Sequence, residues 1–126
     1  MIVYTMVGTQ NLEKAKAFYD AVCAVIDMEL CWNDAQSVSY GKKADPFFPR
    51  IFVGYPFDGN ASSVGNGSMT AFYCQTTEKV DEAFNQAMQH GGQSEGEPGY
   101  RPHYGEGFYA AYVRDPDGNK LAFVDF

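Results

Sequence analysis

Residues 107–126 read GFYAAYVRDPDGNKLAFVDF, with alternating apolar runs on both sides of Asp115-Pro116-Asp117-Gly118. Pro116 presets φ for the first central position of a β-turn, Asp115 can accept backbone hydrogen bonds, and Gly118 tolerates the positive φ that closes such a turn. Alternation of apolar residues is typical of strands that bury one face. The stretch therefore predicts a C-terminal β-hairpin.

The remainder of the chain predicts one order of elements twice. The first half contains four strand-like runs and one amphipathic helix capped by Asn11, at residues 1–8, 12–25 (the helix), 28–32, 38–41 and 50–55. The second half contains a strand, a helix capped by Thr77, a short strand and the final hairpin, at residues 68–75, 77–90, 93–97 and 107–126. Apolar residues at three- and four-residue spacing mark both helices. Each half thus predicts a βαβββ module.

Three stretches carry a family resemblance: VGTQNLEKAKAFYDAV at residues 7–22, VGNGSMTAF at 64–72, and YGEGFYAAY at 104–112 before the Asp-Pro-Asp-Gly turn. Together they resemble the glyoxalase, bleomycin-resistance and extradiol-dioxygenase superfamily, known as the vicinal oxygen chelate fold. The resemblance implies an α+β fold in which two βαβββ modules form curled mixed sheets around a shared cup, with the helices outside. It implies one glyoxalase-like domain over residues 1–126, with module one at about 1–57 and module two at about 67–126.

Metal-dependent members of that family bind a divalent ion through a His on the first strand, a His opening the second module, and a Glu after the final turn. The corresponding positions hold Tyr4, Met69 and Ala122. A fourth ligand would fall within residues 51–55, where neither His nor Glu occurs. Divalent metals prefer carboxylate, imidazole or thiolate ligands. We therefore expect no metal cofactor. A divalent metal would be expected only if these ligand positions are wrongly assigned.

Alternate residues of a strand share one face. The residues expected on the concave face, together with one arginine suited to an anionic group, form the predicted ligand-binding set: Tyr4, Met6, Met69, Ala71, Tyr73, Arg101 and Ala122. Such an apolar lining with phenolic tips suits a flat or aromatic small molecule. In the alternative interpretation, the same side chains fill the cup as core.

Acid–base chemistry has three candidate residues. His103 and Glu106 lie in the loop after residue 97, and Tyr4 lies on the first strand, so burial in the cup could tune them for catalysis. The alternative is that His103 is an ordinary exposed loop residue. His90, at a predicted helix end, is interpreted as a capping residue.

Four functions remain open at this point. The favoured one is a bleomycin-resistance-like protein that binds a small organic molecule in the cup without a metal. The first alternative is a divalent-metal-dependent lyase or isomerase of the lactoylglutathione-lyase type. The second is a metal-independent acid/base enzyme, and the third is a regulatory or structural module without a small ligand, which ranks below binding. The missing metal ligands favour binding over the metal-dependent reaction.

Composition limits the partners and the compartment. A net charge of −7 and the absence of a basic cluster argue against nucleic acid, and no apolar run is long enough to span a bilayer. The three cysteines lack metal-site spacing and predict reduced thiols in a cytoplasmic protein. Phe47 and Phe48 in the loop 45–49 are interpreted as a lid or a subunit contact, and the family resemblance implies a homodimer.

Overall fold

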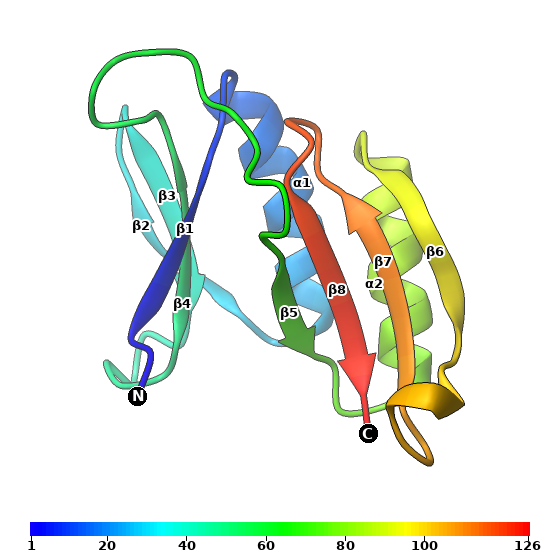
Figure 1. Cartoon of the computed structure of the whole chain (residues 1–126). Coiled ribbons are helices and arrows are strands. Elements are labelled where there is room, and N and C mark those ends of the chain that lie inside the picture. The colour runs from blue at the N-terminus through cyan, green and yellow to red at the C-terminus, as the bar shows by residue number, and fades with distance from the viewer.

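Each half of the chain folds into a four-stranded sheet with one helix against it (Figure 1). The computed structural model describes all residues, 1–126. The elements of the first half are β1 (Tyr4–Gly8), α1 (Leu12–Val25), β2 (Glu29–Asn33), β3 (Ser37–Gly41) and β4 (Arg50–Gly54). Those of the second half are β5 (Thr70–Tyr73), α2 (Thr77–Gln89), β6 (Gln93–Tyr100), the short 3-10 helix η1 (Pro102–Tyr104), β7 (Tyr109–Arg114) and β8 (Lys120–Asp125).

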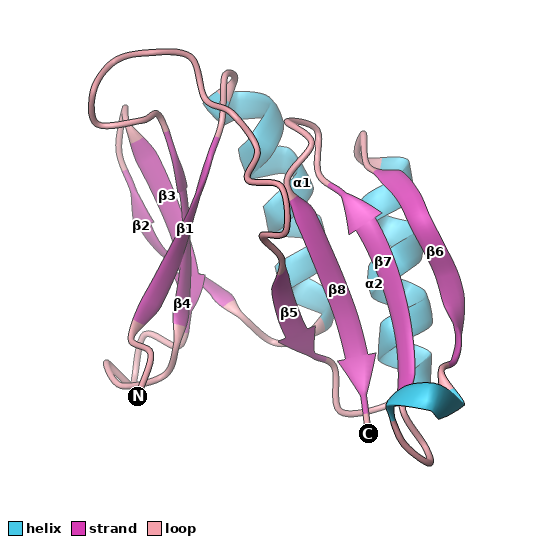
Figure 2. Cartoon of the chain, viewed as in Figure 1, coloured by secondary structure: helices cyan, strands magenta, loops and turns pink.

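The two sheets have equivalent strand orders, β1-β4-β3-β2 and β5-β8-β7-β6. In each, the first strand pairs in parallel with the last, whereas the other pairs are antiparallel. No ladder joins β1 to β5, so the sheets stay separate and unclosed, and a gap separates these two edge strands (Figure 2). The predicted α+β fold of two βαβββ modules is confirmed.

Both helices begin at a side-chain cap. Asn11 Oδ1 accepts from the backbone N–H of Lys14 at 3.1 Å, as predicted for the N-cap of α1. In α2 the cap is Thr76, whose Oγ1 accepts from the N–H of Lys79 at 3.1 Å. The prediction of Thr77 as the cap was wrong by one residue, because Thr76 is the one that keeps an extended backbone. Neither helix has the length and apolar composition that crossing a bilayer demands.

One apolar cluster of 20 buried residues lies between the sheets and the helices. It takes alternate residues of the strands, such as Val38 and Tyr40 on β3, and Leu121 and Phe123 on β8. The opposite face of each sheet, here called its open face, carries no helix (Figure 1). A second, smaller cluster of Ala110, Ala122 and Val124 lies on the open face of the second sheet, packed against Phe108 and Tyr112.

The Asp-Pro-Asp-Gly turn is organised by the carboxylate of Asp115, which is 3% exposed. Its Oδ1 accepts from the backbone N–H groups of Asp117 at 2.9 Å and Asn119 at 3.0 Å. Its Oδ2 accepts from the Tyr19 hydroxyl at 2.6 Å and from Asn119 Nδ2 at 2.9 Å. Gly118 takes a φ of 91°, as the turn prediction requires. Four hydrogen bonds thus satisfy a carboxylate that water does not reach.

This turn also connects the two modules. Tyr19 belongs to α1, so its bond to Asp115 crosses from the first module to the second. Asn119 Nδ2 donates to the carbonyl oxygen of Gly8 at 2.9 Å, and the N–H of Gln10 donates to Asp117 Oδ1 at 2.8 Å. The end of β1 and the start of α1 are therefore held against the β7–β8 turn.

Two further tyrosine–aspartate bonds tie each helix to its own sheet. Tyr40 on β3 donates to Asp20 on α1, and Tyr109 on β7 donates to Asp81 on α2, both at 2.6 Å. The bond to Asp81, with burial as a smaller cause, raises the pKa of Tyr109 from 10.0 to about 12. Burial, then the Asp115 carboxylate, raises the pKa of Tyr19 well above its ordinary value.

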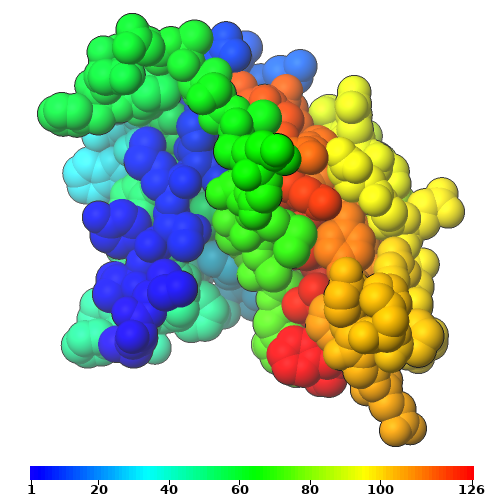
Figure 3. All heavy atoms as spheres, viewed as in Figure 1, coloured from blue at the N-terminus to red at the C-terminus, as the bar shows by residue number.

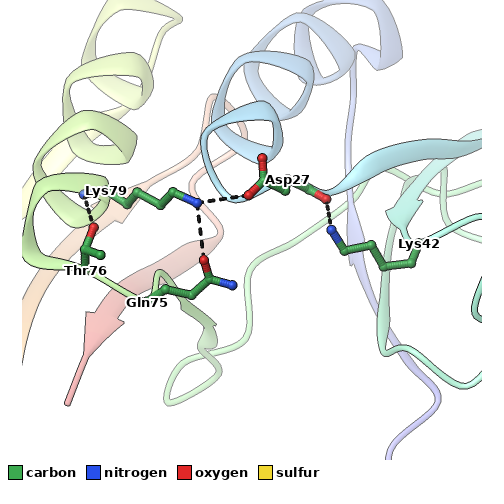
Figure 4. A network of polar contacts seen from close by, with 5 residues as sticks. All are labelled: Asp27, Lys42, Gln75, Thr76 and Lys79. Carbon is green, nitrogen blue, oxygen red and sulfur yellow. Dashed lines mark hydrogen bonds and ion pairs between the residues drawn. The ribbon is translucent and has the colours of Figure 1, made fainter.

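At the far end of the molecule, a polar network joins the end of α1 to the start of α2 (Figure 4). Lys79 Nζ lies 2.9 Å from Asp27 Oδ2 and 3.2 Å from Gln75 Oε1, while Lys42 Nζ donates to the carbonyl oxygen of Asp27. The hydrogen bond that Asp27 accepts from Lys79 holds the pKa of the Asp27 carboxyl below its usual value. Asp27 and Gln75 are the two non-glycine residues with positive φ, 58° and 71°. The modules are thus linked at both ends.

Replacing Asp115 by alanine should lower the free energy of unfolding by about 2 to 4 kcal/mol, because the buried Tyr19 hydroxyl and the Asn119 side chain lose their shared acceptor. Urea denaturation measures this change. Asp117→Ala is the matched control in the same turn: it removes the exposed contact to Gln10 and should cost less than about 1 kcal/mol. Equal effects of the two substitutions would contradict the role given to Asp115.

Stability should fall at alkaline pH. A raised tyrosine pKa means that the folded state retains a proton that the unfolded chain releases, so the stabilisation is complete below about pH 10 and is lost above it. For Tyr109 the window runs from 10.0 to about 12. Denaturation at stepped pH should show a decline there, and Tyr109→Phe should make it shallower. A decline of unchanged steepness in the variant would contradict this assignment.

Candidate functional site

The seam between the edge strands β1 and β5 contains the two cavities of interest. Figure 3 shows it as a furrow between the blue N-terminal strand and the green segment that leads into β5. Thr5, Met69 and Thr70 line both cavities, so the two adjoin along the seam. Residues from both modules form the walls, because the sheets meet here without a hydrogen-bonded ladder.

The smaller cavity has a volume of about 260 Å³ and a mostly polar wall. Its lining residues come from β1, the linker before β5, and the start of β8: Thr5, Met6, Val7, Gly8, Ser63, Val64, Gly65, Ser68, Met69, Thr70, Asn119 and Lys120. Asn119 also belongs to the turn network, since its Nδ2 donates to Gly8. The same contact that joins the modules therefore forms part of this wall.

The larger cavity has a volume of about 590 Å³, and nine of its 15 lining residues are hydrophobic. They come from the N-terminus, the end of α1, the loop before β4, and β5: Ile2, Thr5, Ile26, Met28, Lys42, Phe48, Pro49, Arg50, Ile51, Met69, Thr70, Ala71, Phe72, Tyr73 and Gln75. The wall contains two cationic side chains and no carboxylate. Its volume and apolar character are those of a small-molecule site.

Four of the seven residues predicted to bind ligand lie along this seam. Met6 lines the smaller cavity, Ala71 and Tyr73 line the larger one, and Met69 lines both. Met69, Ala71 and Tyr73 are exposed whereas the intervening Phe72 is buried, which agrees with the alternation expected along β5. Their contact with a ligand remains a prediction.

The other three predicted residues line neither cavity. Ala122 is 1% exposed and lies in the cluster under Phe108 and Tyr112, so no ligand reaches it in this state. Arg101 Nη2 donates to the carbonyl oxygen of Glu97 at 2.7 Å, and its guanidinium lies 5.6 Å from the Tyr112 ring centroid. Tyr4 is exposed on the open face of the first sheet.

The candidate acid–base residues are not assembled. His103 lies in η1 beside Tyr104, with ring centroids 4.1 Å apart, and Glu106 is exposed in the following turn. Tyr4 belongs to the other sheet, where its ring packs on Phe52. No hydrogen bond joins any two of the three. His90 is placed as predicted, at the C-terminus of α2 with Nδ1 2.8 Å from the carbonyl oxygen of Gln86.

The residues at the family's metal-ligand positions do not fit a divalent metal. They offer one phenol, one thioether and one methyl group, from Tyr4, Met69 and Ala122. On β4, Phe52 is the residue that packs against Tyr4. None of these groups is a good ligand for a hard or borderline divalent ion at neutral pH. No group of three or more His, Cys, Asp or Glu side chains elsewhere is placed to hold one.

Arg114 has partners that the sequence did not indicate. Its Nε pairs with Glu95 Oε1 at 2.7 Å, and its Nη1 donates to the carbonyl oxygen of Gly118. The neighbouring Asp115 is turned inward to Tyr19. The contributions of Ile26, Met28 and Arg50 to the cavity were also missed, since nothing local indicates that the end of α1 and the start of β4 face β5.

None of the three cysteines belongs to a disulfide, and Cys23 and Cys74 are fully buried. Burial raises the pKa of the Cys74 thiol to about 11 and that of Cys23 further. A nucleophilic cysteine requires the opposite shift. Thiol chemistry therefore contributes nothing to this site.

The comparisons with known proteins agree with this architecture. The family model for the Glyoxalase/Bleomycin resistance protein/Dioxygenase superfamily matches residues 1–123. A crystal structure of a glyoxalase/bleomycin resistance protein from Albidiferax ferrireducens T118 is 31% identical, with a TM-score of 0.87 over 98% of this chain and 97% of that chain.

A lactoylglutathione lyase from Agrobacterium tumefaciens is 21% identical, with a TM-score of 0.68 over 98% of this chain and 92% of that chain, and at this identity the likeness shows the fold alone. A search of curated protein sequences gave no match. The family model spans nearly the whole chain, and the chain belongs to the glyoxalase/bleomycin resistance protein/dioxygenase superfamily.

Proposed function

We propose that this protein binds a small, largely apolar organic molecule in the seam between its modules, without a divalent metal. The observation that carries the proposal is the larger cavity, whose volume of about 590 Å³ and nine hydrophobic lining residues suit such a ligand. Met28 and Met69 give its wall the adaptable surface found at sites that accept varied apolar shapes.

Neither catalytic alternative has the side chains that its reaction requires in the seam, and this favours binding without a reaction. A metal-dependent lyase or isomerase needs ligands that Tyr4, Met69 and Ala122 do not supply. An acid/base enzyme needs a proton donor or acceptor held near its substrate, whereas His103 and Glu106 line neither cavity. The two cavities are lined by serine and threonine hydroxyls, one phenol, two amides and three cationic residues, and by no carboxylate or imidazole that could serve as a general base.

We further propose that the protein is a cytoplasmic homodimer. Tyr4, Trp32, Phe47 and Tyr73 are large aromatic side chains that the single chain leaves exposed, and a subunit interface would remove such side chains from water. A second copy that covers them would also narrow the access to the seam. The absence of disulfides among three cysteines is consistent with a reducing compartment.

Met69→Arg tests the location of the ligand. Met69 is 49% exposed and lines both cavities, so a longer charged side chain should fill the seam and lower the affinity for an apolar probe at least tenfold. The neutral dye Nile red, titrated by fluorescence, supplies the measurement.

Phe57→Arg is the matched control, because Phe57 is fully exposed and lines neither cavity. It should leave the affinity for Nile red within about twofold, since no contact to the seam is lost. Unchanged affinity in Met69→Arg, or an equal loss in both variants, would remove the seam as the binding site.

Light scattering at micromolar concentration should give twice the chain mass of 14.0 kDa. Phe47→Asp should shift the protein toward the single-chain mass, because Phe47 is 68% exposed in the loop predicted as a subunit contact. A monomer mass for the unaltered protein would rule out the dimer, and a dimer unaffected by Phe47→Asp would place the contact elsewhere.

A further inference from the structure

The open face of the second sheet carries two cations that converge on one tyrosine ring. The Arg101 guanidinium lies 5.6 Å from the centroid of the Tyr112 ring, and Lys120 Nζ lies 5.8 Å from the same centroid. Tyr112 is on β7, between β6 and β8, so Arg101 reaches the ring from the β6 side and Lys120 from the β8 side. In Figure 1 helix α2 lies behind this sheet, on its other face. All three side chains are half-buried, so part of each is in contact with water.

Two glycines of β6 leave the space that the guanidinium occupies. A Cβ at position 99 would lie 3.0 Å from Arg101 Nη1, and a Cβ at position 96 would lie 3.4 Å from Arg101 Nη2 and 3.1 Å from Tyr112 Cδ2. Glycine within a strand often marks such a close approach. Arg101 Nη2 also donates to the carbonyl oxygen of Glu97 at 2.7 Å. The backbone of β6 therefore holds the guanidinium beside Tyr112.

Neither cation has a carboxylate partner. The three ion pairs of the chain involve other basic side chains, so no carboxylate oxygen lies within pairing distance of Arg101 or Lys120. A guanidinium has five N–H donors, and an ammonium has three. Arg101 engages one of its donors in the bond to Glu97, which is exposed to water. The other donors of this pair of side chains are left for a ligand.

The carboxylate that Lys120 influences is that of Glu95, and it is engaged by Arg114. The hydrogen bond from Arg114 is the main cause that lowers the pKa of the Glu95 carboxyl, and the charge of Lys120 makes the smallest contribution. Two cations thus lie on one ring without a paired carboxylate, although the chain has a net charge of −7. Like charges repel at short distance, and an anion from outside the chain would offset this repulsion.

Aromatic side chains continue this face beside the two cations. Tyr112 and Phe108 both pack on the smaller apolar cluster of the sheet. The backbone N–H of Arg101 donates to the carbonyl oxygen of Phe108 at 2.8 Å, so the aromatic row begins beside the arginine. Phe108 stacks on Phe126 with centroids 6.0 Å apart, and Phe126 is 76% exposed. A face that is cationic at one end and aromatic at the other is complementary to an anion with an aromatic body.

We propose that Arg101 and Lys120 form, at Tyr112, a binding site for small aromatic carboxylates on the open face of the second sheet. The carboxylate accepts from the planar fork of Arg101, Lys120 supplies a second positive charge from the opposite side, and the ring of the ligand lies toward Phe108. Lys120 also lines the smaller cavity, but none of these residues lines the larger one. The site is therefore separate from the one proposed for apolar ligands and does not depend on it.

Benzoate and benzamide provide the test, because they share one flat ring and differ in charge. In calorimetric titrations of the full-length protein, benzoate should bind about tenfold more tightly than benzamide, since charge-assisted hydrogen bonds form with the carboxylate alone. Arg101→Gln and Lys120→Gln should each weaken benzoate binding and leave benzamide unchanged. Arg101→Lys retains the charge but lacks the fork, so its affinity for benzoate should fall between those of Arg101→Gln and the unaltered protein. Far-ultraviolet circular dichroism verifies that each variant is folded.

Lys43→Gln is the matched control, because it removes one positive charge from an exposed side chain of the first module that lines neither cavity. Its affinity for benzoate should stay within about twofold of the unaltered protein, since water and salt screen a distant exposed charge. Equal affinity for benzoate and benzamide, or a preference that survives in both glutamine variants, would overturn the site and leave the two cations as support for Tyr112. An equal loss in Lys43→Gln would also overturn it, because the effect would then follow net charge.

Nile red separates this site from the seam. Arg101→Gln should leave the affinity for Nile red within about twofold, because Arg101 lines neither cavity. Loss of Nile red binding together with benzoate binding in Arg101→Gln would overturn the separate site. Loss of Nile red binding in Met69→Arg, without any preference for benzoate in the unaltered protein, would overturn this site and leave binding in the seam intact.

Discussion

The Asp115 carboxylate holds the two modules in their relative position. It is buried, and its four hydrogen bonds come from the turn itself and from Tyr19 on the helix of the other module. A buried charge is tolerated only when its acceptor sites are filled. The turn, the start of α1 and the end of β1 must therefore keep one arrangement. This constraint places β1 beside β5 and so creates the seam.

The seam remains open because the sheets meet through edge strands that do not pair. Both helices pack on the other side, where the core cluster lies, and the tyrosine bonds to Asp20 and Asp81 fix each helix to its sheet. The open faces and the seam are left for contacts with other molecules. An apolar cavity then follows from the arrangement of the sheets, because residues of both modules meet there without a hydrogen-bonded ladder.

Local sequence predicted the elements well, because turns, caps and periodic apolar stripes depend on neighbouring residues. The Asp-Pro-Asp-Gly turn, the Asn11 cap and the alternation along β5 are examples. Predictions that depended on distant partners were less accurate. Ala122 is covered by Phe108 and Tyr112, Arg101 folds back toward Glu97 outside both cavities, and Arg114 pairs with Glu95 across the sheet.

The central claim is that small organic molecules bind in the seam between the modules. Mapping of backbone amide chemical shifts during titration with a small neutral aromatic compound tests it most directly, since it locates the ligand without substitutions. The account predicts that the largest shifts cluster at Thr5, Met69, Thr70 and Arg50, which line the larger cavity. Shifts confined to the η1 segment around His103, with the seam unchanged, would contradict it and would direct attention to the loop between β6 and β7.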